Sequence, residues 1–223
     1  AGDGSQGTPY QISSAEELAY LAMMVNGGET YDGKYFELTA DIDLGGKEWT
    51  PIGKEFYTFK GQFNGNGYTI SNFTINKQSE DYIGLFGYNS DTRVIMNLAV
   101  EGGVVNGSSY VGGICGLNKG TIYCCSFDGE VSGRSFVGGI CGEDDSIIDN
   151  CFNSGNIKGN SHVGGICGRL YSGSISYCIS VGKIESTGTL CIGGVLARAC
   201  VQDVLIYRAG TDIRSKNTFT VGT

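Results

Sequence analysis

The segment YVGGICG, residues 110–116, is repeated almost unchanged as FVGGICG at residues 136–142 and as HVGGICG at residues 162–168. A looser copy, YIGLFG, begins at Tyr82, and a degenerate copy, CIGGVLA, begins at Cys191. The three close copies are 26 residues apart. A fixed period of roughly 20 to 50 residues is the signature of a solenoid, an array or a propeller.

Each unit contains two further short segments of β type. An apolar run follows each copy, for example TIYCCSF from Thr121, IIDNCFN from Ile147 and DVLIYRA from Asp203, and a short segment such as GEVSG from Gly129 closes the unit. A propeller blade needs four strands and about 40 residues, and a helical solenoid needs a period of 3.6. The repeat therefore predicts an all-β fold, a right-handed parallel β-helix with three short strands per coil.

Six of the nine cysteines mark this repeat as two columns, which are Cys115, Cys141 and Cys167, and Cys125, Cys151 and Cys178. An odd number of cysteines cannot all pair within one chain. There is no CxxC pair, and His162 is the one histidine, which is not the pattern of a zinc site. We expect stacks of small buried side chains. Disulfides between some neighbours, or a metal or redox site, are the alternatives, and disulfides would need an oxidising compartment.

The parity of the repeated segment leaves one question open. On a regular strand Val111 and Ile114 point to opposite faces, so both cannot face the core. A bend at the paired glycines, Gly112 and Gly113, would reconcile them.

Residues 1–81 lack the repeat, and residues 13–28 have the pattern of a helix. Ser14 is the expected N-cap, with Glu17 completing a capping box. The helix has one apolar stripe and should end at Gly27 or Gly28; the stripe consists of Leu18, Leu21, Ala22 and Val25. We expect the helix to cover the open end of the first coil, the alternative being a position along the side.

The rest of this region is expected to form irregular first coils. Its predicted strands are YFELT from Tyr35, ADIDL from Ala40 and WTPIG from Trp49, followed by residues 59–76 with a tight turn at Asn64-Gly65-Asn66-Gly67. The chain is thus predicted to be a single β-helix domain over residues 1–223. Its parts are the cap and first coils (1–81), the repeats (82–207) and a C-terminal end or linker (208–223).

Charge and hydropathy restrict the partners. The formal net charge is −8, so the surface repels phosphate backbones and nucleic acid is not an expected partner. No apolar stretch approaches the roughly 20 residues that span a bilayer, so membrane insertion is not expected.

The sequence offers little reactive chemistry. A zinc peptidase would need an HExxH motif, and a single histidine excludes it within this chain. His162 could serve as a base for a serine or cysteine nucleophile, but it fills the slot that holds Tyr110 and Phe136 in the sister repeats. The best acidic cluster, which could bind calcium or form an acid/base pair, is Glu143, Asp144, Asp145 and Asp149, with Asp128, Glu130 and Glu101 at roughly matching positions in earlier repeats. We expect solvated loops there, and we assign no catalytic, cofactor-binding or metal-ligating residue.

The ordered motifs resemble those of the bacterial surface proteins named for the GLUG motif. GLFG at residues 84–87 is close to the motif, GICG recurs at Gly113, Gly139 and Gly165, and the upstream blocks YQISSAEELAYLA, ADIDL, WTPIG and FNGNGYTISNFTI are also similar. The resemblance covers residues 8–207. It implies an extracellular bacterial protein, often one module of a larger surface polypeptide, with related repeats in adhesin-like proteins and beside the peptidase of immunoglobulin-A-specific metallopeptidases. It implies no agreed activity and no catalytic residues.

These observations favour a non-enzymatic extracellular module of the bacterial surface, a stalk or an adhesion scaffold whose partner is a glycan or a host or cell-surface protein. One alternative is a carbohydrate-active enzyme, lyase or hydrolase, which requires a groove with at least two facing carboxylates. The other is an accessory domain of a surface peptidase.

Overall fold

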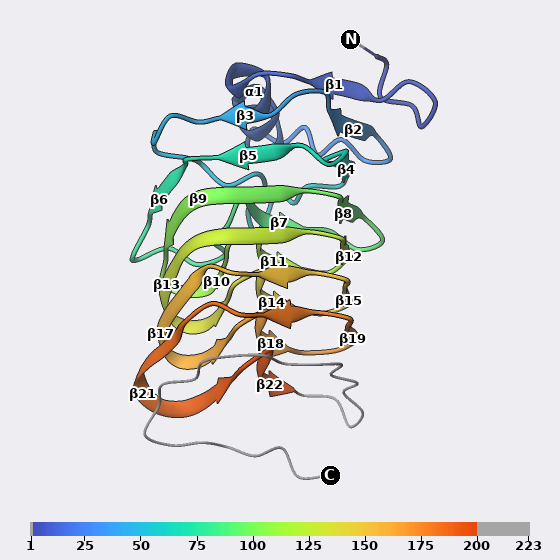
Figure 1. Ribbon diagram of the computed structural model, residues 1–223. Helices are drawn as coiled ribbons and strands as arrows, with labels where there is room; N and C mark the ends of the chain where they lie inside the picture. The colour runs from blue at the N-terminus through green and yellow to red at the C-terminus, as the bar shows by residue number, and fades with distance from the viewer. Residues whose placement is uncertain (1, 200–223) are drawn as a thin grey trace.

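The computed structural model describes residues 2–199, which form a right-handed parallel β-helix with one helix at its N-terminal end (Figure 1). All paired strands lie parallel, in three sheets that we call sheets A, B and C. The predicted fold class is therefore confirmed. The expectations for Cys200, for the run from Asp203 and for residues 208–223 lie outside the described residues.

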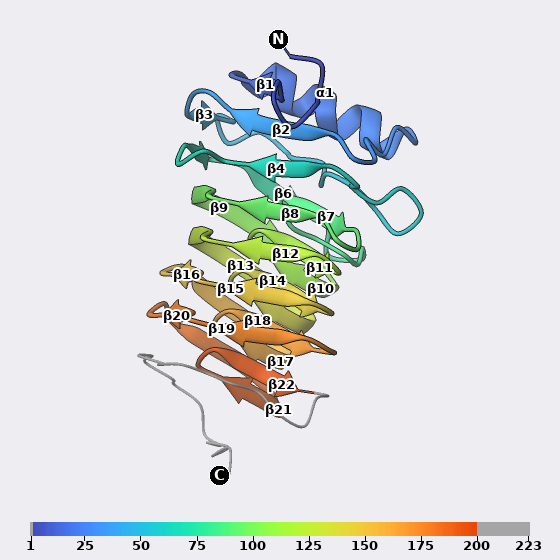
Figure 2. The same ribbon diagram turned by 90° about the vertical axis from the view of Figure 1, so that its right-hand side faces the viewer.

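The strands of each sheet come from successive coils, as Figure 2 shows from the side. Sheet A contains β1 (Tyr10–Ile12), β2 (Tyr35–Leu38), β4 (Gln62–Asn64), β8 (Val94–Met96), β12 (Thr121–Tyr123), β15 (Ile147–Asp149) and β19 (Ser174–Ser176). Sheet B contains β3 (Ile42–Asp43), β5 (Thr69–Ser71), β6 (Thr74–Asn76), β9 (Ala99–Asn106), β10 (Ser109–Gly112), β13 (Ser126–Gly138), β16 (Phe152–Asn153), β17 (Asn156–Gly164), β20 (Ile179–Ser180) and β21 (Ile184–Gly193). Sheet C contains β7 (Phe86–Asn89), β11 (Cys115–Asn118), β14 (Cys141–Asp144), β18 (Cys167–Leu170) and β22 (Leu196–Ala199).

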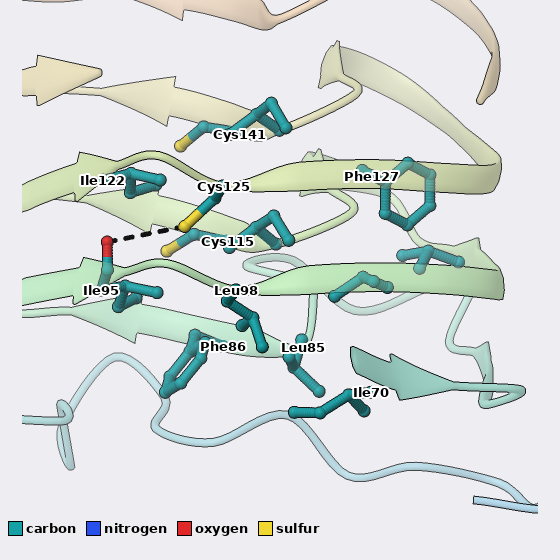
Figure 3. Close-up of a cluster of buried hydrophobic side chains, with 14 of the residues drawn as sticks. Ile70, Leu85, Phe86, Ile95, Leu98, Cys115, Ile122, Cys125, Phe127 and Cys141 are labelled. Atoms are coloured by element: carbon teal, nitrogen blue, oxygen red, sulfur yellow. Dashed lines mark hydrogen bonds between the residues drawn. The ribbon is translucent and has the colours of Figure 1, made fainter. Parts of the chain in front are cut away.

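The cysteine columns are stacks in space. Cys115 pairs in register with Cys141, and Cys141 with Cys167, in the centre of sheet C. These three residues are fully buried, and the second column, Cys125, Cys151 and Cys178, is at most 2% exposed. Figure 3 shows members of both columns among buried aliphatic side chains. The eight cysteines in the described residues are free thiols, so the columns act as small core side chains.

The paired glycines bend the repeated segment, which answers the parity question. Strand β10 ends at Gly112 and β11 starts at Cys115, with a bend at Gly113 and Ile114 between them. Val111, Ile114 and Cys115 consequently all reach the core and are fully buried.

The glycines of this segment are also fixed by close contacts. A Cβ on Gly113 would lie 2.3 Å from the ring of Phe127 inside the coil. A Cβ on Gly142 would lie 2.4 Å from the backbone of Tyr110 in the preceding coil, and Gly116 and Gly168 face the same obstacle. The motif therefore needs glycine because neighbouring coils approach too closely for any side chain.

Two corners of each coil place a non-glycine residue in the left-handed region. Asn97, Cys124, Asn150 and Tyr177, with φ between 50° and 54°, lie where sheet A turns into sheet B. Tyr82, Tyr110, Phe136 and His162, with φ between 53° and 61°, lie where sheet B turns toward sheet C. Such a conformation is uncommon for aromatic residues, and each coil repeats it at the same place.

Helix α1 (Ala15–Asn26) covers the first coil, as expected of a cap (Figure 1). Its four predicted core positions are buried, and Ser14 Oγ accepts a hydrogen bond from the Glu17 amide. The capping box differs in detail, because the Glu17 carboxylate accepts hydrogen bonds from the amide and hydroxyl of Ser13 rather than from the Ser14 amide. Gly27 ends the helix.

The first coils stack in the same sheets as the later ones, but one predicted strand is absent. WTPIG makes an isolated bridge between Ile52 and Phe86 instead of a strand. Its Trp49 is buried and donates an indole hydrogen bond to the Leu85 carbonyl, 3.1 Å away. Backbone hydrogen bonds from Trp49 to Thr74 and from Ile52 to Leu85 also hold this segment.

Candidate functional site

The acidic cluster is divided among different environments. Glu143 is 8% exposed and forms an ion pair with Arg169, whereas Asp144 is fully buried. Asp145 accepts a hydrogen bond from Ser172 Oγ at 2.5 Å, and Asp149 accepts one from Ser176 Oγ at 2.6 Å. The expectation of solvated loops is therefore wrong for Glu143 and Asp144, which are buried on β14, whereas Asp145 and Asp149 bond to serines of the next coil.

The earlier acidic positions lie elsewhere. Glu101 and Asp128 are exposed and paired in register on sheet B, and Glu130 is two residues farther along β13. In the described residues, 2–199, no group of three His, Cys, Asp or Glu side chains is arranged to hold a metal ion.

Asp144 belongs to a buried polar column. The Asn89 side-chain amide donates to Asn118 Oδ1 at 2.8 Å, and the Asn118 amide donates to Asp144 Oδ1 at 2.6 Å. Asp144 Oδ2 has no hydrogen-bond partner. Burial raises the pKa of the Asp144 carboxyl well above its usual range, more than the hydrogen bond from Asn118 lowers it. The raised pKa favours the uncharged carboxyl, which costs less to bury in the core than a carboxylate.

His162 lies in a stacked aromatic row. The rings of Tyr82, Tyr110, Phe136 and His162 follow one another with centroids 4.9, 5.2 and 4.8 Å apart. His162 is 8% exposed, and its Nδ1 lies 2.6 Å from Ser161 Oγ. The stacked rings cover one another's faces, so the row stabilises the corner between sheets B and C.

An ion pair lies over this row. The Arg169 guanidinium is 4.2 Å from the centroid of the Phe136 ring and 5.6 Å from that of Tyr110. Burial raises the pKa of the Glu143 carboxyl, although Arg169 acts in the opposite direction. This arrangement links sheet C to the aromatic corner.

A different surface has the character of a binding site. Six large apolar side chains, 40% to 65% exposed, lie around the corner between sheets A and B. We call them the corner patch, and they are Tyr123, Ile147, Phe152, Tyr177, Ile179 and Val181. They belong to β12, β15, β16, β19 and β20 and the turns beside them (Figure 2).

Two positions of the corner patch carry large exposed side chains only in the later coils. Phe152 and Ile179 are paired in register, and the same position holds Ala99 and Ser126 in the two preceding coils. Likewise Tyr177 follows Asn97, Cys124 and Asn150 in the left-handed corner column. Sequence reasoning missed this surface, although aligning Ser126, Phe152 and Ile179 by the repeat would have revealed the change from polar to apolar.

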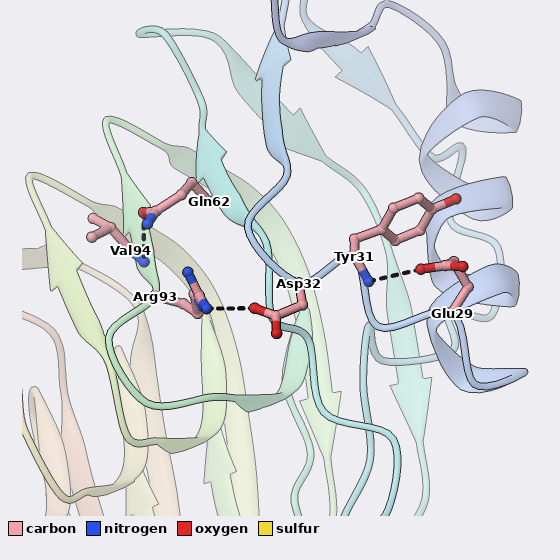
Figure 4. Close-up of polar contacts among 6 residues, drawn as sticks. All are labelled: Glu29, Tyr31, Asp32, Gln62, Arg93 and Val94. Carbon is pink, nitrogen blue, oxygen red and sulfur yellow. Dashed lines mark hydrogen bonds and ion pairs between the residues drawn. The ribbon is translucent and has the colours of Figure 1, made fainter. Parts of the chain in front are cut away.

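The other end of the β-helix is braced by polar contacts. The Arg93 guanidinium lies 2.5 Å from the Asp32 carboxylate, and the Val94 amide donates to Gln62 Oε1 at 3.1 Å (Figure 4). The ion pair ties the loop after α1 to the turn before β8, and the hydrogen bond joins β8 to β4. The helix described by the structure is too short to cross a membrane.

Comparison with known proteins finds a known motif within the repeats. Residues 159–185 match the GLUG motif. The chain is 35% identical over 130 residues to a protein of Evansella cellulosilytica named "Putative Gly-rich membrane protein", which covers 54% of this chain and 14% of that protein. It is 30% identical over 133 residues to halomucin of Haloquadratum walsbyi, which covers 54% of this chain and 1% of halomucin. The chain thus spans a small part of each of these relatives.

A solved structure shows the same fold. A chain titled "putative immunoglobulin A1 protease from Bacteroides ovatus" superposes with a TM-score of 0.76, over 95% of this chain and 69% of that chain, at 24% identity. At this identity the likeness extends to the fold alone. Residues 159–185 thus carry a GLUG motif, and the chain shares its β-helix with this solved structure.

Proposed function

We propose that this chain is a non-enzymatic extracellular module of a bacterial surface protein, which acts as a rigid stalk and binds glycan through the corner patch. The observation that carries the proposal is the cluster of exposed aromatic and aliphatic side chains at this corner, where Phe152 follows Ser126 and Tyr177 follows Asn150 in the repeat. An exposed apolar cluster of this kind marks an interaction surface. The names of the relatives support a surface location.

Glycan is favoured by the geometry of the exposed rings. Tyr123, Phe152 and Tyr177 come from three successive coils and from three different positions around the corner, so their rings are spread over its surface. Tyrosine and phenylalanine offer large rigid contact areas, on which the flat apolar face of a sugar ring can pack. Asp149 and Ser176 beside Tyr123 supply polar groups for hydroxyls.

The experiment is a glycan array with the intact chain, followed by titration of the best ligand. The test variant combines Phe152→Ser and Tyr177→Asn. These changes introduce the residues found at the equivalent positions of the preceding coil, Ser126 and Asn150. Asparagine also tolerates the left-handed backbone at 177. We expect the double variant to bind about 5- to 150-fold more weakly, since each ring contributes about 0.5–1.5 kcal/mol.

Val104→Ser is the matched control, because Val104 is a 41% exposed apolar residue outside the patch. Binding should be unchanged in this control. The proposal fails if the wild-type chain binds no glycan, or binds only a protein partner, or if the double variant binds as tightly as the wild type.

A further inference from the structure

A cavity of about 440 Å³ lies at the N-terminal end, far from the corner patch along the axis (Figure 2). It is bounded by the start of helix α1, by strand β1 and by the loop that leads into β2. The residues that line it are Gly2, Tyr10, Gln11, Ile12, Glu16, Glu17, Tyr20, Leu21, Tyr31 and Phe36. Its volume is in the range of small-molecule sites.

The floor and walls of the cavity are aromatic and aliphatic. Ile12, Leu21 and Phe36 are at most 5% exposed and belong to the core. The rings of Tyr10 and Tyr31 contact Phe36, with centroids 5.2 and 5.0 Å from it. Figure 4 shows the Tyr31 ring extending toward α1.

Tyr20 adds an exposed ring at the rim. Its side chain is 55% exposed on the first turns of α1. The cavity therefore has four aromatic rings, one each from β1, α1, the loop after α1 and β2.

The charge of the rim is negative. Glu16 and Glu17 line the opening, and none of the lining residues is a lysine or an arginine. Hydrogen bonds from the Ser13 amide and hydroxyl lower the pKa of Glu17, so this carboxylate stays charged at neutral pH. A cation in the cavity would meet these two carboxylates and the aromatic residues that line it.

The protein's own cation already uses one of these rings. Lys34 Nζ lies 5.9 Å from the centroid of the Tyr10 ring and donates a hydrogen bond to the Asp3 carbonyl. This contact shows that the Tyr10 ring is accessible to a positive charge from the side of the N-terminal segment.

We propose that this cavity binds a small organic cation of the quaternary ammonium class. A quaternary ammonium group is large, weakly hydrated and has no N–H donor, so aromatic faces with nearby carboxylates recognise it better than water does. A neutral sugar would gain the ring contacts but nothing from the two carboxylates' charge. The cavity is separate from the corner patch, so cation binding and glycan binding can be tested independently.

The test uses the intact chain with choline and tetramethylammonium as probes, followed by NMR or calorimetry. The comparison ligand is 3,3-dimethylbutan-1-ol, which has the shape of choline without the charge. We expect saturable binding of both cations and at least about tenfold weaker binding of the alcohol. Tyr20→Ala and Glu16→Gln should each weaken choline binding about three- to tenfold.

Both variants alter exposed side chains, so the fold should be retained. Met23→Ala is the control, since Met23 is a 60% exposed residue of the same helix that does not line the cavity. It should leave choline binding unchanged. The inference is overturned if neither cation binds, if the alcohol or a neutral monosaccharide binds as well as choline, or if both test variants bind choline like the wild type.

Discussion

Replacing Asp144 with asparagine changes one atom in the buried column that Asn89 and Asn118 begin. The wild-type carboxyl is fully buried, and its Oδ2 has no partner. Burial holds its pKa well above the usual range, so the folded chain favours the protonated carboxyl. The variant would place a neutral amide there, which can donate to the Ser146 carbonyl as Asn118 donates to the Gly120 carbonyl at 2.8 Å.

The gain in stability comes from the ionisation of Asp144 in the unfolded chain. An ordinary aspartate, with a pKa of about 3.9, is ionised at pH 7 when the chain is unfolded. Retaining the proton on folding costs about 1.4 kcal/mol for each unit by which the folded pKa exceeds that value, up to the working pH. The asparagine amide avoids this cost. Asp144→Asn should therefore be more stable than the wild type at pH 7.

The predicted change of stability with pH is opposite to that of an aspartate whose pKa is lowered by folding. Because the folded pKa is raised, the wild type is most favoured below the unfolded pKa and loses stability as the pH rises above about 4. The advantage of the variant should thus be smallest near pH 4 and grow toward pH 7.

Urea unfolding followed by the fluorescence of the buried Trp49 measures this difference at pH 4, 5, 6 and 7. Asp128→Asn, at an exposed carboxyl, should change stability by less than about 0.5 kcal/mol throughout. The reasoning is wrong if Asp144→Asn is no more stable than the wild type at pH 7, or if its advantage is equal at pH 4 and pH 7.

Three further outcomes follow from the structure. Gly142→Ala should cost about 2–4 kcal/mol in the free energy of unfolding, because its Cβ would lie 2.4 Å from backbone in the preceding coil, whereas Gly7→Ala, with nothing within 4 Å, should be close to neutral. Ser14→Ala should cost about 1 kcal/mol in the same assay through loss of the N-cap; an unchanged midpoint would contradict this assignment. Among the described cysteines, the half-buried Cys124 and Cys191 should react first with a thiol reagent, and the core columns should react only on unfolding; equal rates for all thiols would refute the buried columns.

The stacking of coils could be predicted because two separate positions of the repeat carry cysteine. Cys115 and Cys125 each recur at nearly constant spacing, and a parallel stack is the arrangement that brings such positions together. The cap was also predictable, because capping residues and an apolar stripe are local signals.

The surface and the corners could not be predicted in the same way. The position of Tyr110 and Phe136 in the repeat was visible, but not their left-handed backbone, which stacking of neighbouring rings supports only in the assembled coils. The separation of Glu143 from Asp144 depends on which residues face the core, and the bend at the glycines shifts that parity. WTPIG has strand-forming residues, yet the packing of Trp49 determines its conformation.

Anomalous scattering from the native sulfur atoms of a crystal would test the stacked coils most directly. Cys115, Cys141 and Cys167 should give three peaks in a straight row at steps of about 4.8 Å, parallel to a second row from Cys125, Cys151 and Cys178. Sulfur peaks that are scattered, or joined in pairs about 2.05 Å apart, would contradict the stacking of free thiols along the axis.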